Sequence, residues 1–310
     1  MFEDFTYFFN RSTYTIKDLI YIPKKYNCIS IYYNNRYKYW MFFSRLIFII
    51  RKYFFIYPVG FYSLNKEWLL YLKLLKPKSQ NKSIIFFTTH KCASTFFDIF
   101  FKETVKESGL VKINFDEFKG RYEELLSLDK IYEKSPKDKG FSFAPVRSYQ
   151  KFANKENYKV ILCLRDPRDV LVSLYYSMMY SHTINSNKIL DVRNNYKDKI
   201  DDFVISYANK YFDIYTEYMN ELDDYFFINY TDLIKNPKKI LLNTLEYLEI
   251  NLPIEKATKY SISLQNPIKE NIYNHKRSGK SGQYKTHLNK KTIEKLNIIF
   301  SDINNFYNFE

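Results

Sequence analysis

The sequence predicts an α/β protein with a mostly parallel central sheet and helices on both faces. Three segments repeat the order of a short apolar run, a polar loop and a stretch with helical spacing, and their apolar runs begin near residues 84, 160 and 225. Strands that alternate with helices pair in parallel and are covered on both faces. Ligands of such sheets bind at the carboxyl ends of the strands, so we expect the site in these loops.

The first unit begins with the apolar run 84–87, which is typical of a strand buried on both faces. The polar loop His90–Thr95 follows it, and residues 96–105 then have the pattern of a helix. A loop at a helix N-terminus directs backbone N–H groups and the positive helix end at an anion. Lys91 adds a positive charge, so the loop is a candidate anion site, although a plain strand-to-helix turn has a similar composition.

The second unit is the strand 160–164, followed by a helix from Pro167 to about Met179. Proline suits the first helical position, and an acidic residue suits the cap and the third position. We therefore expect Asp166 as the N-cap and Asp169 as the acidic residue of the first turn.

Arg165 stands at the end of this second strand. Its side chain binds phosphate through two parallel hydrogen bonds, while a capped helix start with local ion pairs is the alternative interpretation. The third unit has a strand at 225–228, a loop at 229–236 and a helix at 237–248.

A basic loop with two glycines lies near the C-terminus, at residues 277–285. Glycines let the backbone approach a ligand closely, and the cations neutralise an anion. A solvated surface loop is the alternative.

Residues 1–80 are predicted to form a separate N-terminal segment, and residues 81–310 the main domain, with a polar boundary near 76–81. Within the segment, residues 39–62 are apolar and aromatic but contain two arginines and a lysine. A membrane-spanning helix needs about 20 apolar residues, so spanning is the least favoured role. Capping the main domain as part of an acceptor pocket, or contact with a membrane interface, are the two roles left open.

Composition narrows the class of protein. The net charge of +14 favours anionic partners, and 20% aromatic residues provide a large core. Three cysteines and four histidines form no metal-binding motif. We therefore expect a reducing compartment, a cytoplasmic location, and membrane association only through residues 39–62.

The loops together resemble the PAPS-dependent sulfotransferase family, where PAPS is 3′-phosphoadenosine-5′-phosphosulfate. Residues 90–96, HKCASTF, resemble the family's PKSGTTW loop, which holds the 5′-phosphosulfate. Residues 165–176, RDPRDVLVSLYY, resemble RNPKDVAVSYY, whose Arg and Ser grip the 3′-phosphate. Residues 230–237, YTDLIKNP, are similar to YEDLKxNP, whose Tyr lies beside the adenine. Residues 277–285 are similar to RKGxxGDWK, whose Arg and Gly close over the 3′-phosphate.

This resemblance implies a donor site and a role for Lys91, which would stabilise the oxygen that leaves with the product. The implied donor-binding residues are Lys91, Cys92, Ala93, Ser94, Thr95, Phe96, Arg165, Ser173, Tyr230, Arg277, Ser278 and Gly279. The chain departs from the family pattern at Ala93 (Gly in the family), at Phe96 (Trp) and at Ser278 (Lys). Gln283 and Tyr284 also replace Asp and Trp, so the closing loop is the least well matched.

The catalytic base is not assigned by the resemblance. Cytosolic small-molecule members of the family carry a His in an HLP-like stretch, but residues 141–147 here read FSFAPVR. Other branches use a Glu, so the candidates are Asp98, Glu103 and His182, and a structural role is the alternative for each.

The sequence therefore predicts an enzyme that transfers a sulfuryl group from PAPS to a hydroxyl or amine and releases PAP, the 3′,5′-bisphosphate. The acceptor is a small molecule, a lipid or a glycan, and no nucleic acid is expected. Sulfuryl transfer depends, like phosphoryl transfer, on alignment and charge neutralisation; because the transferred group carries one negative charge, no metal is expected. The alternatives are a catalytically silent protein that binds PAP, an anionic glycan or a lipid, and a P-loop kinase-like transferase, which would need a Lys after the glycines.

Overall fold

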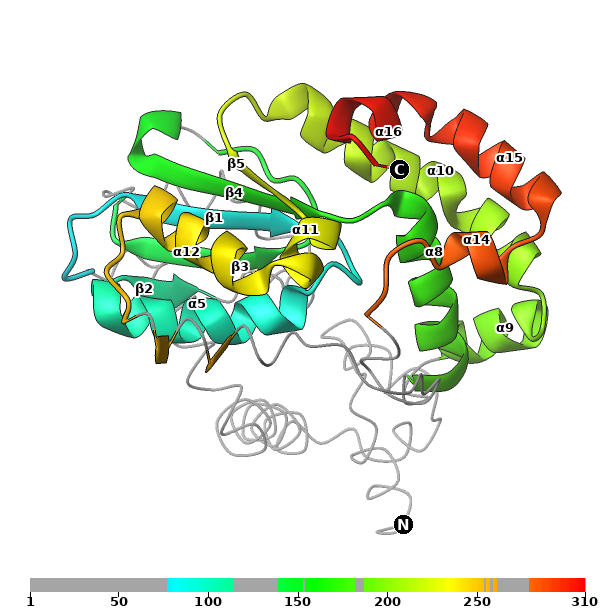
Figure 1. Ribbon diagram of the computed structural model, residues 1–310, viewed down its shortest axis with the longest axis horizontal. Helices are drawn as coiled ribbons and strands as arrows, with labels where there is room; N and C mark the ends of the chain where they lie inside the picture. Colours follow the sequence, from blue (N-terminus) through cyan, green and yellow to red (C-terminus); the bar gives the residue numbers. More distant parts are fainter. Residues whose placement is uncertain are drawn as a thin grey trace, which may run out of the picture. The chain divides into compact units, whose positions relative to one another are not determined.

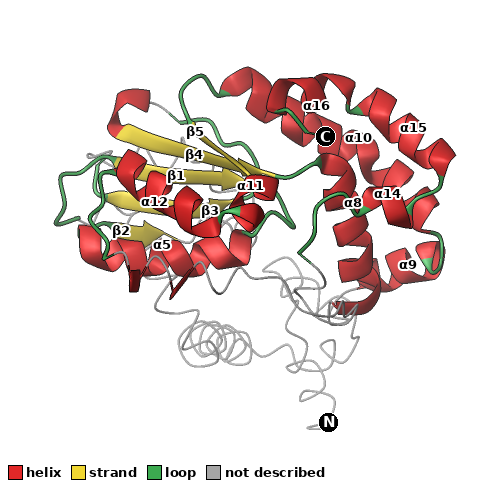
Figure 2. Cartoon of the chain, viewed as in Figure 1, coloured by secondary structure: helices red, strands yellow, loops and turns green. Residues whose placement is uncertain are grey.

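The protein has an α/β fold built on one parallel sheet (Figure 1, Figure 2). Among the described residues, the sheet contains five strands in the order β2-β3-β1-β4-β5, and these strands pair in parallel. The predicted fold class is thus confirmed. This computed structural model describes residues 77–113, 139–152, 154–181, 187–253, 255–256, 259–260 and 279–309.

The first predicted unit is β1 (Ser83–Thr88) followed by α5 (Ser94–Ser108). All six residues of β1 are buried, as the apolar run predicts. α5 begins two residues earlier than predicted, directly after Ala93, whose φ of 56° is in the left-handed region. A non-glycine residue in this region costs roughly 1–2 kcal/mol, which the surrounding packing has to offset.

The second unit is β4 (Tyr158–Leu164) followed by α8 (Pro167–Tyr176). Asp166 is the N-cap, as predicted, because its side chain accepts a hydrogen bond from the backbone N–H of Arg168. The helical path continues beyond α8 as a π-helical turn, η3 (Ser177–Ser181).

The third unit is β5 (Phe226–Asn229) and α12 (Pro237–Leu248), close to the predicted bounds. The prediction of a loop over 229–236 is wrong, because α11 (Tyr230–Lys235) occupies most of it. The side chain of Asn229 accepts a hydrogen bond from the Thr231 N–H and so caps this short helix.

Two strands were not predicted, β2 (Val111–Ile113) and β3 (Phe141–Val146). β3 lies between β2 and β1, and all of its residues are buried. The described residues also form the short helix η2 (Lys155–Asn157), α9 (Asn187–Tyr196), α10 (Ile200–Glu221), α14 (Tyr284–His287), α15 (Lys290–Ile299) and α16 (Ser301–Tyr307).

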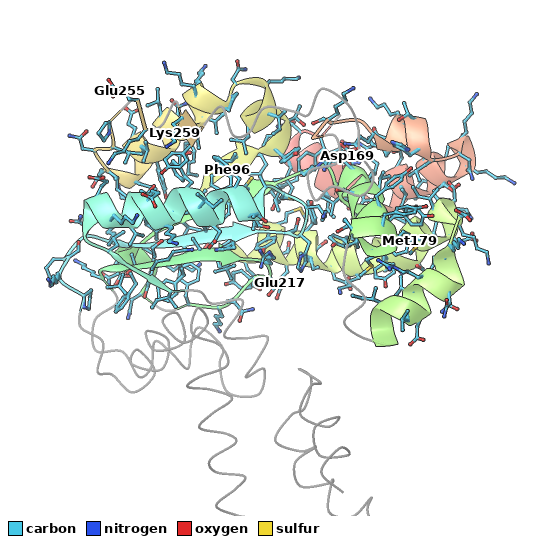
Figure 3. The ribbon with its side chains drawn as sticks, turned by 90° about the horizontal axis from the view of Figure 1, so that it is seen from below. Phe96, Asp169, Met179, Glu217, Glu255 and Lys259 are labelled. Atoms are coloured by element: carbon cyan, nitrogen blue, oxygen red, sulfur yellow. The ribbon has the colours of Figure 1, made fainter. Side chains whose placement is uncertain are left out.

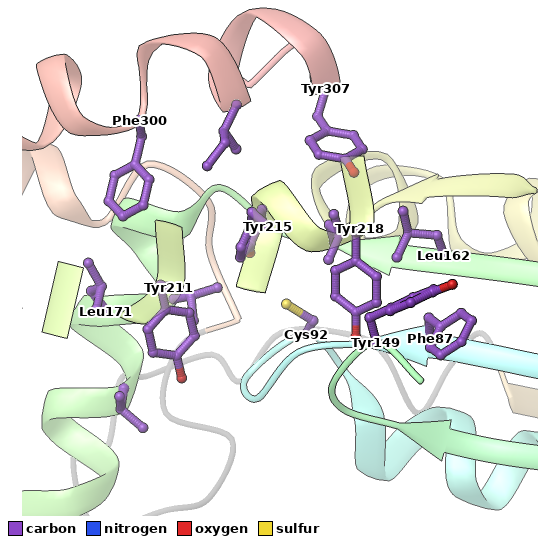
Figure 4. Close-up of a cluster of buried hydrophobic side chains, with 14 of the residues drawn as sticks. Phe87, Cys92, Tyr149, Leu162, Leu171, Tyr211, Tyr215, Tyr218, Phe300 and Tyr307 are labelled. Atoms are coloured by element: carbon purple, nitrogen blue, oxygen red, sulfur yellow. The ribbon is translucent and has the colours of Figure 1, made fainter. Parts of the chain in front are cut away.

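The two faces of the sheet are packed by different helices. Successive side chains of a strand point to opposite faces, so Ile84 and Phe86 join α5 and α12, whereas Ile85 and Phe87 join α8, α10, α15 and α16. Figure 4 shows the second of these clusters, in which Phe87 and Cys92 lie beside aromatic residues of α10. Both faces of the sheet are thus covered, and the loops at its carboxyl end rest on a packed core.

The predicted N-terminal segment falls outside the described residues except for positions 77–80. Its boundary, and the role of residues 39–62, therefore stay predictions. Across the described ranges, no helix is both long enough and apolar enough to cross a membrane.

Candidate active site

The first loop, between β1 and α5, directs Lys91 toward the second unit. Lys91 has a φ of 67°, and its Nζ donates a hydrogen bond to Ser177 Oγ at 2.9 Å. Ser177 begins the π-helical turn after α8. Such turns occur often at functional sites. This one accepts a hydrogen bond from Lys91, the predicted leaving-group residue, and so connects the first unit to the second.

Ser173 and Ser177 are four residues apart on the same helical path, so they lie on one face of it. Ser173 is half-buried. Because Lys91 reaches this face through Ser177, the structure brings the predicted residues Lys91 and Ser173 to the same side of α8.

Cys92 points away from the loop surface. Its side chain is fully buried, and its Sγ lies 2.9 Å from Thr89 Oγ1. Burial raises the pKa of the Cys92 thiol, and the contact with Thr89 opposes this shift. Only the backbone of Cys92 is therefore placed to face a ligand.

The rest of the first loop forms the start of α5. Ser94 is nearly buried and accepts hydrogen bonds from Arg147, whereas Thr95 is exposed. Phe96 lies half-buried on α5 (Figure 3). Its ring stacks on that of Phe100 with centroids 6.2 Å apart.

Arg165 is the buried cation at the end of β4. Its side chain is 3% exposed, and its Nη2 donates to the Lys280 carbonyl oxygen at 2.7 Å and to Asp169 Oδ2 at 3.3 Å. Its guanidinium lies over the Tyr230 ring, 4.7 Å from the centroid. Its Nε has no hydrogen-bond partner among the described residues, so a buried donor remains for an anion.

Arg165 and Tyr230 influence each other's ionisation. Burial lowers the pKa of Arg165, but the neighbouring Tyr230 phenol and the Asp169 carboxylate raise it, and the resulting pKa is raised. Burial raises the pKa of Tyr230, and the charge of Arg165 acts in the opposite direction. At neutral pH the pair is thus a cation stacked on a neutral phenol.

Asp169 joins the second loop to the C-terminal loop, which sequence reasoning did not predict. It is fully buried (Figure 3), and besides Arg165 it accepts hydrogen bonds from the backbone N–H of Gly282 at 2.8 Å and of Tyr284 at 3.1 Å. The sequence placed it only in the first turn of α8. The available signal was the charged run 165–169, which indicated local ion pairs at the helix start but no contact with a distant loop.

The C-terminal loop is held by contacts with α8 and α11. Gly279 and Gly282 have φ values of 66° and 76°, in the region that favours glycine. Ser281 Oγ lies 3.0 Å from Thr231 Oγ1 of α11. Arg277 and Ser278 lie outside the described residues, so their predicted contacts stay predictions.

The candidate bases Asp98 and Glu103 both lie on α5 and are engaged in ion pairs. Asp98 pairs with Lys112, and Glu103 pairs with Lys106 at 2.7 Å. At about 1.5 Å per residue, Glu103 lies more than two helical turns from the start of α5, so the structure does not bring it to Lys91. The third candidate, His182, lies outside the described residues. Within the described part of the chain, no group of three His, Cys, Asp or Glu residues could hold a metal ion.

Comparison with known proteins gives the family. A family model, the sulfotransferase domain, matches residues 81–308, which is more than half of the chain. The chain therefore belongs to the sulfotransferase family. It is thus an enzyme that transfers a sulfuryl group from PAPS, and the predicted class and reaction are confirmed.

Solved structures include two that resemble this one at low identity. Mouse sulfotransferase SULT7A1 complexed with PAP is 16% identical, with a TM-score of 0.46, and the match covers 77% of this chain and 88% of that chain. Retinol dehydratase in complex with androsterone and PAP is 17% identical, with a TM-score of 0.48, and the match covers 77% and 84%. No curated protein matches the sequence.

Proposed function

We propose that the three strand ends and the C-terminal loop form the PAPS site, with Arg165 as the 3′-phosphate ligand. The observation that carries this proposal is the buried guanidinium of Arg165, which lies over the Tyr230 ring and keeps an Nε–H without a partner among the described residues. A buried donor left without a partner costs roughly 1–3 kcal/mol. A phosphate oxygen at that position would remove this cost, so the residues present suit the bisphosphate.

Lys91 and the N-terminus of α5 bind the 5′-phosphosulfate in this proposal. Lys91 donates to Ser177, and its flexible ammonium can turn from this neutral oxygen to an anionic one. In the transition state it neutralises the charge that develops on the oxygen between phosphorus and sulfur. Lys91 therefore acts on the chemical step, whereas Arg165 acts on binding.

The acceptor is proposed to be a small molecule with a hydroxyl or amine and an apolar body. Half-buried aromatic side chains lie near the Lys91–Ser177 contact: Tyr176 donates or accepts a hydrogen bond with His287 at 3.0 Å, and its ring lies 6.0 Å from that of Tyr180. Such rings suit an apolar acceptor. Lipid and glycan acceptors, and membrane contact through residues 39–62, are the other outcomes of an acceptor screen.

A cytoplasmic location remains part of the proposal. Cys92 and Cys163 are both free thiols, and they belong to clusters on opposite faces of the sheet. Free cysteines are typical of reducing compartments.

The donor site is tested by titration calorimetry of PAP against 5′-AMP, which lacks the 3′-phosphate. Each lost charge-assisted contact costs roughly 1.5–3 kcal/mol, so we expect PAP to bind at least about 100-fold more tightly. Arg165→Ala should remove most of this difference, and Lys159→Ala, a lysine at the opposite end of β4, should leave it unchanged. Equal affinities of the wild-type protein for PAP and 5′-AMP would contradict the proposed site.

The acceptor is tested by incubating the protein and labelled PAPS with a metabolite extract and identifying sulfated products by mass spectrometry. A labelled product with an apolar body supports the proposal. Labelled glycans alone would replace it with the glycan alternative.

A further inference from the structure

Arg147 lies on the side of the first loop that is away from Arg165. It directly follows β3, whose last residue, Val146, pairs with Phe87 of β1. The sheet order places β3 on one side of β1, and β4 and β5 on the other. Arg147 and Arg165 therefore flank the first loop from opposite sides.

The guanidinium of Arg147 contacts the first residue of α5. Its Nε and Nη2 both lie 3.3 Å from Ser94 Oγ. These two nitrogens form the edge with which Arg grips two oxygens of an oxyanion. Here that edge contacts the neutral hydroxyl oxygen of Ser94, at distances longer than the usual value of about 2.9–3.0 Å. An oxyanion at the start of α5 would thus meet this edge as well as the helix end.

Two cations, Lys91 and Arg147, are placed to pair with the negative charges of the reacting group. Lys91 approaches from the α8 side, where it donates to Ser177, and Arg147 approaches from the β3 side. In a phosphosulfate bound between them, the three terminal sulfuryl oxygens share one negative charge, and in the transition state charge also develops on the oxygen that bridges phosphorus and sulfur. A compact ammonium suits the single bridging oxygen, whereas a planar fork suits two terminal oxygens.

We propose that Arg147 binds the terminal oxygens of the PAPS sulfuryl group while Lys91 neutralises the charge that develops on the bridging oxygen; this inference rests on the proposed donor site. During transfer, the acceptor oxygen or nitrogen forms a bond to sulfur, and the bond from sulfur to the bridging oxygen breaks. The electron pair of that bond stays on the 5′-phosphate of PAP, and the acceptor proton leaves to a base or to solvent. Arg147 keeps the terminal oxygens neutralised as the nucleophile approaches.

PAP lacks the sulfuryl group, so the comparison of PAPS with PAP isolates this contact. We expect Arg147→Gln to weaken PAPS binding by about 10-fold or more, and to change PAP binding by less than about twofold. Arg147→Lys keeps the charge but loses the planar guanidinium, so its affinity for PAPS should lie between those of the wild type and Arg147→Gln. In the absence of acceptor, release of sulfate from PAPS by water should also slow in Arg147→Gln. Affinities come from calorimetry, and sulfate is measured by ion chromatography.

Two controls separate this role from simpler ones. Lys151→Gln removes the same charge from an exposed position four residues along the chain and should leave both affinities unchanged. Ser94→Ala removes the hydroxyl that Arg147 contacts and should weaken PAP and PAPS together.

The outcomes separate a failure of the proposed Arg147 role from a failure of the proposed donor site. Equal weakening of PAP and PAPS in Arg147→Gln would mean that Arg147 only positions Ser94, and no weakening of either would remove it from the donor site; both results overturn the inference and leave the proposed function intact. A wild-type protein that binds neither nucleotide overturns both. PAP binding also reports that a variant is folded, and Arg147→Lys provides the test if Arg147→Gln does not fold.

Discussion

Replacing Asp169 with Asn tests whether one buried carboxylate joins the second loop to the C-terminal loop. Asp169 is fully buried and accepts hydrogen bonds on both oxygens, from Arg165 and Gly282 on Oδ2 and from Tyr284 on Oδ1. Asn has nearly the same shape, but it has one acceptor oxygen and one NH₂ group. Whichever way the amide is turned, it places a donor opposite at least one N–H group.

The expected loss in the free energy of unfolding follows from these contacts. One buried N–H loses its acceptor, which costs roughly 1–3 kcal/mol. Arg165, 3% exposed, loses its buried counter-charge, and breaking a buried ion pair by removing one partner costs about 3–5 kcal/mol. Because both terms describe overlapping contacts, we expect a total loss of about 3–5 kcal/mol in the free energy of unfolding.

Urea unfolding without nucleotide measures this loss. The matched control is Asp232→Asn, which removes an exposed carboxylate from the first turn of α11 and should cost at most about 1 kcal/mol. In the folded fraction of Asp169→Asn, PAP affinity should also fall by about 10-fold or more, because the C-terminal loop has lost its anchor. A variant with an unfolding free energy within about 0.5 kcal/mol of wild type would refute the reasoning.

Further predictions concern chemistry, metal, pH and the N-terminal segment. Lys91→Ala should lower turnover by about 100-fold or more while PAP affinity changes little; a variant with normal turnover would remove Lys91 from the leaving group. Activity should survive EDTA, and loss that Mg²⁺ restores would revive the kinase-like alternative. Stability should fall above about pH 10, since burial raises the pKa of Tyr211 and Tyr215 and the unfolded chain loses these protons first. Tyr211→Phe should flatten that fall by up to about 1.4 kcal/mol per pH unit, and an unchanged slope would assign it to other groups. Deleting residues 1–80 should spare PAP binding but harm acceptor turnover or liposome binding, and unchanged values of both would show that the segment does neither.

The three strand–loop–helix units were predictable because each has a strong local signal. β1 is a continuous apolar run, and α8 starts with an N-cap and a proline. β3 lacked such a signal: it contains Pro145, which ordinarily argues against an interior strand. Its place in the sheet comes from pairing with β1, more than fifty residues earlier in the chain. Non-local pairing of this kind has no local signature.

For the candidate site, too, residues with a local signal were predicted and long-range contacts were not. Arg165 and Tyr230 are each marked by position at a strand end, but their contact, with the guanidinium over the ring, was not predicted. Asp169 and Arg147 were missed, because their importance depends on which distant backbone or hydroxyl group meets them. Spacing in the sequence reports neighbours on one helix, but it does not report a contact between a helix start and a loop more than a hundred residues later.

The buried face of α10 explains how the core fixes the geometry of these loops. Tyr215 donates its hydroxyl to the carbonyl oxygen of Arg165, and Tyr218 donates to that of Thr88 at 2.7 Å (Figure 4). Both phenols are fully buried, and they lie three residues apart, on one face of the helix. A carbonyl at the end of a strand has no further ladder partner, and leaving it buried and unbonded costs roughly 1–3 kcal/mol. One helix therefore satisfies the last carbonyl of β1 and the carbonyl directly after β4, and it sets the spacing between the Lys91 loop and Arg165. The proposed donor site depends on this buried contact as much as on the residues that would touch the nucleotide.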